Sequence, residues 1–309
     1  MSAHSVLVLG AASWNRMVHV DTLPQGREAT IFAGHETEAA GSTGVGKAMV
    51  AAALGHATTL HCALGKDRHA LQIKEACAAR GIVTLVDEHD APTPQHLNIM
   101  DQSGGRYSIF LSNGSETPVL DMDRLTIAIG AAETIFLSLA ASSRIALPLL
   151  ENSTAPVLLD LHNYDGQNPW YDPFIAAADV IQLSNVALTN PRPVVDRLLA
   201  GRAQQVILTK GGAGAEIFTP AIHHCASAHP ARFVDSNGAG DAFSVAFWHA
   251  QTTGASLAEA AHFASVAAAM AIETYDLFPA GRTLKDIALR AAVKTPDALP
   301  PIAPAPKTP

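Results

Sequence analysis

Short apolar runs alternate with longer amphipathic or alanine-rich segments along most of the chain. Runs with strand character cover residues 5–9, 57–62, 82–86, 133–138, 156–160, 179–183, 205–209, 214–218 and 231–235. Segments with helical spacing cover residues 44–54, 68–80, 123–131, 144–151, 168–177, 192–200, 239–253, 256–273 and 283–292. Strands covered by helices on both faces are apolar at nearly every position. The alternation therefore predicts an α/β fold with a central, mostly parallel sheet.

Two stretches depart from this alternation. Residues 16–40 and 94–112 are expected to form extended segments with turns. A surface hairpin also fits the second stretch. The tail 295–309 is rich in proline and lacks apolar periodicity, so we expect it to be disordered. We expect residues 1–294 to form a single domain.

The junction before the helix at 239–253 carries the most informative motif, Asp235-Ser236-Asn237-Gly238-Ala239-Gly240-Asp241. Its glycines let the backbone turn sharply and let a ligand approach the amides. The first turn of a helix has free N–H groups and the positive end of the helix dipole, which together attract anions. The motif therefore predicts an anion site at residues 238–240.

Asp241 lies within this predicted anion site, where a carboxylate would repel a phosphate. That conflict indicates a proton acceptor for an attacking hydroxyl, placed beside donors that hold a transferring phosphoryl group. On local chemistry alone, an ordinary helix start also fits, with glycines for the turn and Asp241 as a first-turn charge.

The motif resembles the Asp-Thr-x-Gly-Ala-Gly-Asp signature of the ribokinase-like (PfkB-type) carbohydrate kinases, with Ser236 in place of the usual Thr. Further segments match that family in the same order, and the resemblance covers roughly residues 5 to 290. These segments are 6–10, 20–24, 41–55, 63–67 and 207–215. The resemblance implies a three-layer α/β/α fold with a small β lid, formed by 16–40 and 94–112, over the sugar. It also suggests a homodimer through the lid.

The resemblance implies an ATP-dependent sugar kinase with Asp241 as the base and the amides of Gly238, Ala239 and Gly240 as the anion hole. It implies ATP and Mg²⁺ as requirements, with K⁺ as a further candidate near Asp235. Along the nucleotide it places Thr209, Gly211, Gly214, Asn237 and, more weakly, Ser265. Toward the sugar it places Asn15, Gly41, Ser42, Lys47, Asn98 and Asn163.

Several residues depart from the family pattern, mostly at the sugar end. Gly46 stands where the family usually has an Asn. Asn15 stands where the family has a sugar-binding Asp, and the loss of that negative charge removes charge assistance from hydrogen bonds to the sugar hydroxyls. Residues 184–188 lack the Glu associated with magnesium. The loop 160–166 has Tyr164 and no Arg, which favours a neutral sugar over an acidic one; its Asp and Asn residues also fit a simple turn.

Two further patterns suggest ligand sites of other kinds. Residues 41–48 nearly match the P-loop pattern, but Ala48 stands where a magnesium-binding hydroxyl is required. His223, His224, Cys225 and His229 could suggest a zinc or copper site. Their spacing lacks a paired arrangement with a fourth ligand, so a solvated strand edge and turn explains them better.

Composition narrows the class of partner. The net charge of −8 and the isoelectric point near 5.9 offer no basic surface for nucleic acid or an anionic membrane. The three cysteines are too few and scattered for a disulfide framework, the first residues lack a signal-peptide pattern, and apolar runs are too short to span a bilayer. We therefore expect a cytoplasmic protein with a small-molecule partner.

Two alternative functions stay open at this stage. A nucleoside kinase of the same fold could use the same anion hole to phosphorylate a ribosyl hydroxyl. A catalytically silent sugar- or nucleotide-binding protein would be consistent with the missing Glu and with Asn15. Asp241 argues against the silent protein, because a binder has little use for a carboxylate inside a phosphate pocket.

Overall fold

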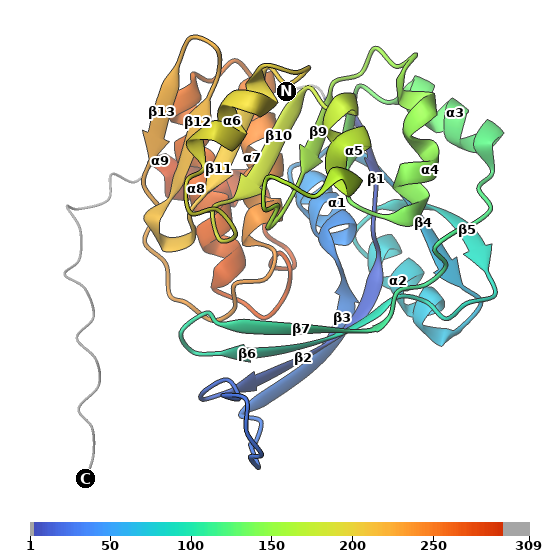
Figure 1. The fold of residues 1–309 in the computed structure, drawn as a ribbon, viewed down its shortest axis with the longest axis vertical. Helices are drawn as coiled ribbons and strands as arrows, with labels where there is room; N and C mark the ends of the chain where they lie inside the picture. Colours follow the sequence, from blue (N-terminus) through green and yellow to red (C-terminus); the bar gives the residue numbers. More distant parts are fainter. Residues whose placement is uncertain (1–2, 293–309) are drawn as a thin grey trace.

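The computed structural model describes residues 3–292, and within them nine strands form one large sheet (Figure 1). Its order is β13-β12-β11-β10-β9-β8-β1-β4-β5. Strand β12 is antiparallel to both of its neighbours, β11 and β13, and all other neighbouring pairs are parallel. The strands are β1 (Ser5–Leu9), β4 (Ala57–Gly65), β5 (Val83–His89), β8 (Thr134–Leu137), β9 (Val157–Asp160), β10 (Val180–Ser184), β11 (Gln205–Thr209), β12 (Ala215–Phe218) and β13 (His223–Ala226).

Two hydrophobic cores cover the two faces of this sheet. Strand β1 contributes Val6 and Val8 to one core and Leu7 and Leu9 to the other, because successive side chains point to opposite faces. The first core packs α1 (Thr43–Ala53), α2 (Arg68–Ala78), α7 (Ala239–Thr252), α8 (Leu257–Ile272) and α9 (Leu284–Ala292). The second packs α3 (Met122–Ala131), α4 (Ala141–Leu150), α5 (Asp172–Ala177) and α6 (Arg192–Leu199). The fold is therefore a three-layer α/β/α arrangement.

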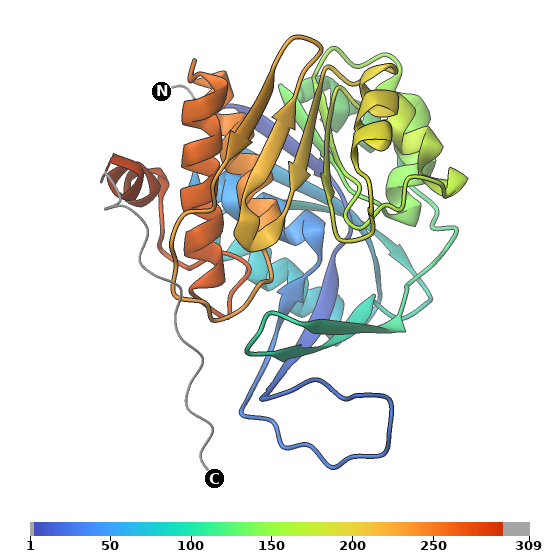
Figure 2. The same cartoon turned by 60° about the vertical axis from the view of Figure 1, so that its left-hand side comes forward.

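A second, four-stranded sheet lies at one end of the body, beside the amino end of α1 (Figure 1). Its order is β3-β2-β6-β7, from β2 (Ser13–Val20), β3 (His35–Gly41), β6 (Gln95–Asp101) and β7 (Arg106–Ser112). We call it the small sheet. The connection between β2 and β3 extends away from the body (Figure 2). These strands largely overlap the two stretches, 16–40 and 94–112, that break the sequence alternation, although β2 begins before residue 16 and β3 ends at residue 41.

Capping interactions explain where several helices begin. Asp67 accepts hydrogen bonds from the His69 and Ala70 amides at the start of α2. Ser256 and Glu259 form a capping box at the start of α8. Helix α7 instead begins at Gly238, which has a φ of 78° and no side-chain cap, so the first amides of α7 stay free for a ligand.

Most expected elements agree with the structure to within a few residues, but two expectations need correction. Residues 231–235 were expected to form a strand and do not, because the Val234 and Asp235 amides bond to the Ile272 carbonyl at the end of α8. The outer strand of the large sheet is β13 instead. The predicted helix 168–177 begins as a short 3₁₀ turn at Pro169–Tyr171 before α5.

The expected disordered tail 295–309 lies outside the described residues. Among the helices in 3–292, none is long and apolar enough to cross a membrane.

Candidate active site

The loop from Asp235 to Gly238 leads into α7, where the sequence predicts an anion site. Only glycine fits at 238, because its φ is 78° and an added Cβ would overlap the carbonyl of Leu277. The first amide of α7 that bonds within the helix is that of Ala242, to the Gly238 carbonyl. The amides of residues 239–241 therefore point out of the helix end as donors, as an oxyanion requires.

Asp241 is almost buried in the first turn of α7, with 8% of its surface exposed. One carboxylate oxygen, Oδ1, accepts hydrogen bonds from the Thr43 hydroxyl at 2.6 Å and from the Lys47 ammonium at 2.5 Å. The other oxygen, Oδ2, has no hydrogen-bond partner among residues 3–292 and lies against Gly46, where a Cβ would overlap it. The free oxygen can accept a proton.

Lys47 is completely buried, and its ammonium contacts three oxygens. It donates to Thr43 Oγ1 at 2.6 Å, to Asp160 Oδ2 at 3.0 Å and to Asp241 Oδ1. Burial lowers the pKa of Lys47, but Asp160 and Asp241 outweigh it and raise this pKa above its ordinary value. Lys47 was expected to meet the sugar; in the structure it is buried and bound to both carboxylates.

Asp160 ends β9 and is the second carboxylate on Lys47. Burial raises the pKa of Asp160, yet His162 and Lys47 outweigh that effect and hold this pKa at about 2. The carboxylate also accepts from the His162 amide at 2.9 Å and from Gln182 Nε2 at 3.3 Å. Gln182 also donates to the Gly240 carbonyl at 3.0 Å. Gln182 therefore links the carboxylate of Asp160 to the first turn of α7, next to the loop 235–238, which we call the anion loop.

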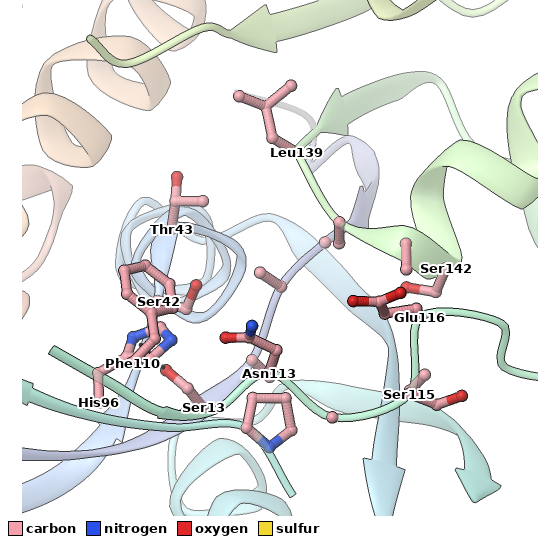
Figure 3. Close-up of a pocket in the computed structure, with 18 of the residues that line it drawn as sticks. Ser13, Ser42, Thr43, His96, Phe110, Asn113, Ser115, Glu116, Leu139 and Ser142 are labelled. Atoms are coloured by element: carbon pink, nitrogen blue, oxygen red, sulfur yellow. Dashed lines mark hydrogen bonds between the residues drawn. The ribbon is translucent and has the colours of Figure 1, made fainter. Parts of the chain in front are cut away.

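A cavity of about 690 Å³ opens beside the amino end of α1 (Figure 3). Ser42 and Thr43 lie at that helix end, His96 and Phe110 come from the small sheet, and Ser142 and Glu116 lie on the far side. Thr43 connects the cavity to Asp241 through its hydroxyl. The rest of the lining is Gly10, Ala11, Ala12, Ser13, Ala63, His89, Pro94, Asn113, Gly114, Ser115, Leu139, Ala140, Ala141, His162 and Trp170.

The lining has polar hydroxyl, amide and imidazole groups but neither Lys nor Arg. Glu116 supplies its one carboxylate. Burial lowers the pKa of His96 to about 4, so its imidazole is neutral near pH 7. Such a cavity suits a ligand rich in hydroxyl groups and disfavours an anionic one.

Two non-glycine residues with a positive φ, Ser42 at 75° and His162 at 51°, both line this cavity. Backbone strain of this kind in folded proteins clusters at ligand sites, where the surrounding structure holds it in place. Its occurrence at two residues of one cavity lining supports a binding role.

The other residues expected near the sugar lie outside the cavity lining. Asn15 is buried and accepts a hydrogen bond from Ser13 Oγ at 2.6 Å. A Cβ at Gly41 would overlap the Asn15 side chain, so glycine at 41 makes room for it. Asn98 is buried in β6, and Asn163 is exposed on its loop. Ser42 alone of the six expected residues lines the cavity. Helical spacing from Lys47 could have suggested Thr43, but no local pattern indicated Trp170 or Glu116.

Of the five residues expected along the nucleotide, Thr209, Gly211 and Gly214 lie at the turn between β11 and β12. Gly211 and Gly214 have φ values of 54° and 90°, and a Cβ at Gly214 would overlap the Ala226 carbonyl. Thr209 Oγ1 donates to the Leu183 carbonyl at 3.3 Å. Ser265 is buried and donates to the Ser227 carbonyl at 3.1 Å. Asn237 accepts from Arg106 of the small sheet at 2.8 Å, so its side chain joins that sheet to the anion loop.

The residues expected to hold cations are already engaged by protein groups. Asp235 accepts from His19 Nε2 at 3.0 Å and from the Asn237 amide at 2.7 Å, which leaves little of its carboxylate for K⁺. Magnesium prefers carboxylate oxygens. Asp160 and Asp241 both bind Lys47, and residues 184–188 contain no carboxylate. These residues therefore do not fit a magnesium ion held by the protein itself.

The histidine-rich segment does bring three potential ligands together. Glu216, His223 and Cys225 offer donor atoms within 4.8 Å of one another, whereas His224 and His229 are not in this group. The Lys210 ammonium, however, lies 2.6 Å from the Glu216 carboxylate and already neutralises it. A strand edge with polar side chains, as expected, accounts for the cluster.

The chain is similar to known carbohydrate kinases in sequence. The pfkB family carbohydrate kinase profile matches residues 4–278. The acarbose 7(IV)-phosphotransferase of Actinoplanes sp. is 30% identical over 285 residues, covering 88% of this chain and 93% of that protein. The ribokinase of Arabidopsis thaliana is 26% identical over 305 residues, covering 90% and 79%.

Solved structures agree with the fold. A microbiome-derived acarbose kinase superposes with a TM-score of 0.84 at 26% identity, covering 94% of this chain and all of that one. The Arabidopsis thaliana ribokinase complexed with ribose and ATP superposes with a TM-score of 0.77 at 22% identity, covering 95% and 100%. Together with the glycine loop, Asp241 and the three-layer fold, the match over nearly the whole chain shows that this protein belongs to the pfkB family of carbohydrate kinases.

Proposed function

We propose that this kinase transfers the γ-phosphoryl group of ATP to a hydroxyl of a neutral carbohydrate bound in the cavity beside α1. The observation that carries the proposal is Asp241, which combines a free carboxylate oxygen with the open amides at the start of α7. A proton acceptor and an anion hole on one helical turn are the two groups that phosphoryl transfer to an alcohol needs.

In this mechanism the acceptor hydroxyl lies beside Oδ2 of Asp241, the carboxylate oxygen that Thr43 and Lys47 leave free. Its proton passes to Asp241 Oδ2 as its oxygen bonds to the γ-phosphorus. The bond between that phosphorus and the β–γ bridging oxygen breaks, and ADP leaves with the electron pair. The amides of residues 238–240 stabilise the charge on the transferred group. Gly211 has open space beside its backbone, which leaves room for the nucleotide to approach.

The cavity favours an acceptor without negative charge, because its lining has a carboxylate but no Lys or Arg. Its volume of about 690 Å³ also exceeds what one sugar ring needs and falls in the range typical of larger small-molecule ligands. Trp170, 40% exposed on the lining, offers a flat apolar face of the kind that packs against sugar rings. Two relatives are named as acarbose kinases. We therefore favour a glycoside of more than one ring over a free monosaccharide.

The experiment that tests the function is a coupled assay of ADP release with ATP and Mg²⁺ across monosaccharides, oligosaccharides, acarbose and nucleosides. We expect turnover on a neutral oligosaccharide, with a higher kcat/KM than on any monosaccharide. Turnover confined to nucleosides would identify a nucleoside kinase. Tight sugar binding by calorimetry without turnover on any acceptor would identify a silent binding protein and refute the proposal.

A further inference from the structure

The ammonium of Lys47 touches the carboxylate that we propose as the catalytic base. Its Nζ has three protons to donate, and three oxygens accept them: Thr43 Oγ1, Asp160 Oδ2 and Asp241 Oδ1. The side chain is fully buried, so no water competes for these protons. The ammonium is therefore held in a single position.

We propose that Lys47 is a positioning residue that holds Asp241 Oδ1 so that only Oδ2 faces the acceptor hydroxyl. This inference rests on the proposed function and adds to it the group that orients the base.

Steric evidence supports the same orientation. A Cβ at Gly46 would overlap Asp241 Oδ2, so the carboxylate can lie against the backbone of α1 only because residue 46 is glycine. Gly46 and Lys47 are adjacent on that helix, one making room for the carboxylate and the other binding it. Thr43 lies one helical turn before Lys47 and bonds to the same oxygen, Oδ1.

Charge explains why two carboxylates share this lysine. A buried ammonium beside one carboxylate forms a neutral pair, and the second carboxylate leaves the group of three with one negative charge. That charge is spread over Asp160 and Asp241. Asp160 has other donors, the His162 amide and Gln182, whereas Asp241 has only Thr43 and Lys47. Loss of Lys47 should therefore affect Asp241 more than Asp160.

Lys47 could instead have a purely structural role, as the counter-charge of Asp160. A double variant distinguishes that role from the orientation of Asp241. If Lys47 serves only to neutralise Asp160, then Lys47→Met combined with Asp160→Asn should turn over as fast as Asp160→Asn alone. If Lys47 orients Asp241, the double variant should lose about 10²-fold in kcat relative to Asp160→Asn, because a small misplacement of a catalytic group has effects of that size. Its KM for ATP should change little.

A control variant separates the loss of this lysine from the loss of any lysine. Lys66→Met serves as the matched control, because Lys66 is an exposed lysine whose one ion-pair partner among residues 3–292 is Asp90. Circular dichroism melting verifies that each variant is folded.

A crystal structure, which needs no turnover, keeps this inference separate from the proposed function. In the double variant the Asp241 carboxylate should turn away from the position that it keeps in Asp160→Asn. The same carboxylate position in both variants, or equal kcat in both, would overturn the role of Lys47. If the wild type is inactive on every acceptor but the carboxylate turns in the double variant, the proposed function alone fails.

Discussion

At the scale of single residues, the site requires two positions without a side chain. Glycine at 238 permits the turn into α7, and glycine at 46 permits the carboxylate of Asp241 to lie against α1. The sequence predicted the first glycine, because it stands in a recognisable motif. Gly46 was interpreted as a lost sugar contact, since its partner Asp241 lies far away along the chain and only the fold brings the two together.

Substitution of Gly46 tests this steric account. Gly46→Ala should displace Asp241 Oδ2 and lower kcat by about 10²-fold while leaving ATP affinity nearly unchanged, because the added Cβ overlaps the carboxylate rather than the anion loop. Steady-state kinetics and nucleotide calorimetry measure the two effects. Gly130→Ala in α3 is the control, since a Cβ there meets nothing within 4 Å. It should keep full turnover and gain up to about 1 kcal/mol of stability. Equal activity in both variants would contradict the account.

At the scale of elements, the small sheet makes hydrogen bonds to two residues of the loop 235–238. Arg106 of β7 and Met100 of β6 bond to Asn237, and His19 of β2 bonds to Asp235. The extended stretches were visible in the sequence because they interrupt the helical periodicity. The strand prediction at 231–235 was wrong because it also relied on the local pattern alone. A short apolar run is typical of a strand, but the Val234 and Asp235 amides donate to the Ile272 carbonyl and not to a neighbouring strand.

Removal of the Arg106 contact tests whether the small sheet holds the anion loop in place. Arg106→Met should lower kcat/KM for the sugar by about fivefold, the size expected from one partly exposed hydrogen bond worth about 1 kcal/mol. Arg16→Met is a matched control on the same sheet, because Arg16 pairs only with Glu36 and Glu38 of β3. Kinetics that are identical in the two variants would show that the contact has no role in turnover.

At the scale of the whole molecule, the alternating pattern predicted the layers well, because both faces of a parallel sheet must be covered and apolar runs record that directly. The buried polar clusters were not predictable, since they join residues from distant elements. Beside Trp248, His56 Nδ1 accepts from the His4 amide and its Nε2 lies 2.9 Å from His249 Nδ1. A neutral His56 must therefore carry its proton on Nε2 and donate it to His249.

This histidine pair predicts a loss of stability in mild acid. Burial, and then the neighbouring His249 and His4, lower the pKa of His56 to about 4. Between about pH 6.5 and pH 4 the unfolded chain binds a proton that the folded ring does not, so the free energy of unfolding falls as pH falls, by up to about 3 kcal/mol. Urea unfolding across this range should show a smaller decrease for His56→Gln than for wild type. Parallel curves would contradict the assignment.

The central claim is that Asp241 removes the proton from the acceptor hydroxyl. The most direct measurement is kcat of Asp241→Asn on the best acceptor, with nucleotide affinity measured in the same variant. Asparagine keeps the size of the side chain but cannot take up the proton, so kcat should fall by about 10²–10⁴-fold while ATP still binds. Turnover at the wild-type rate in Asp241→Asn would contradict the account.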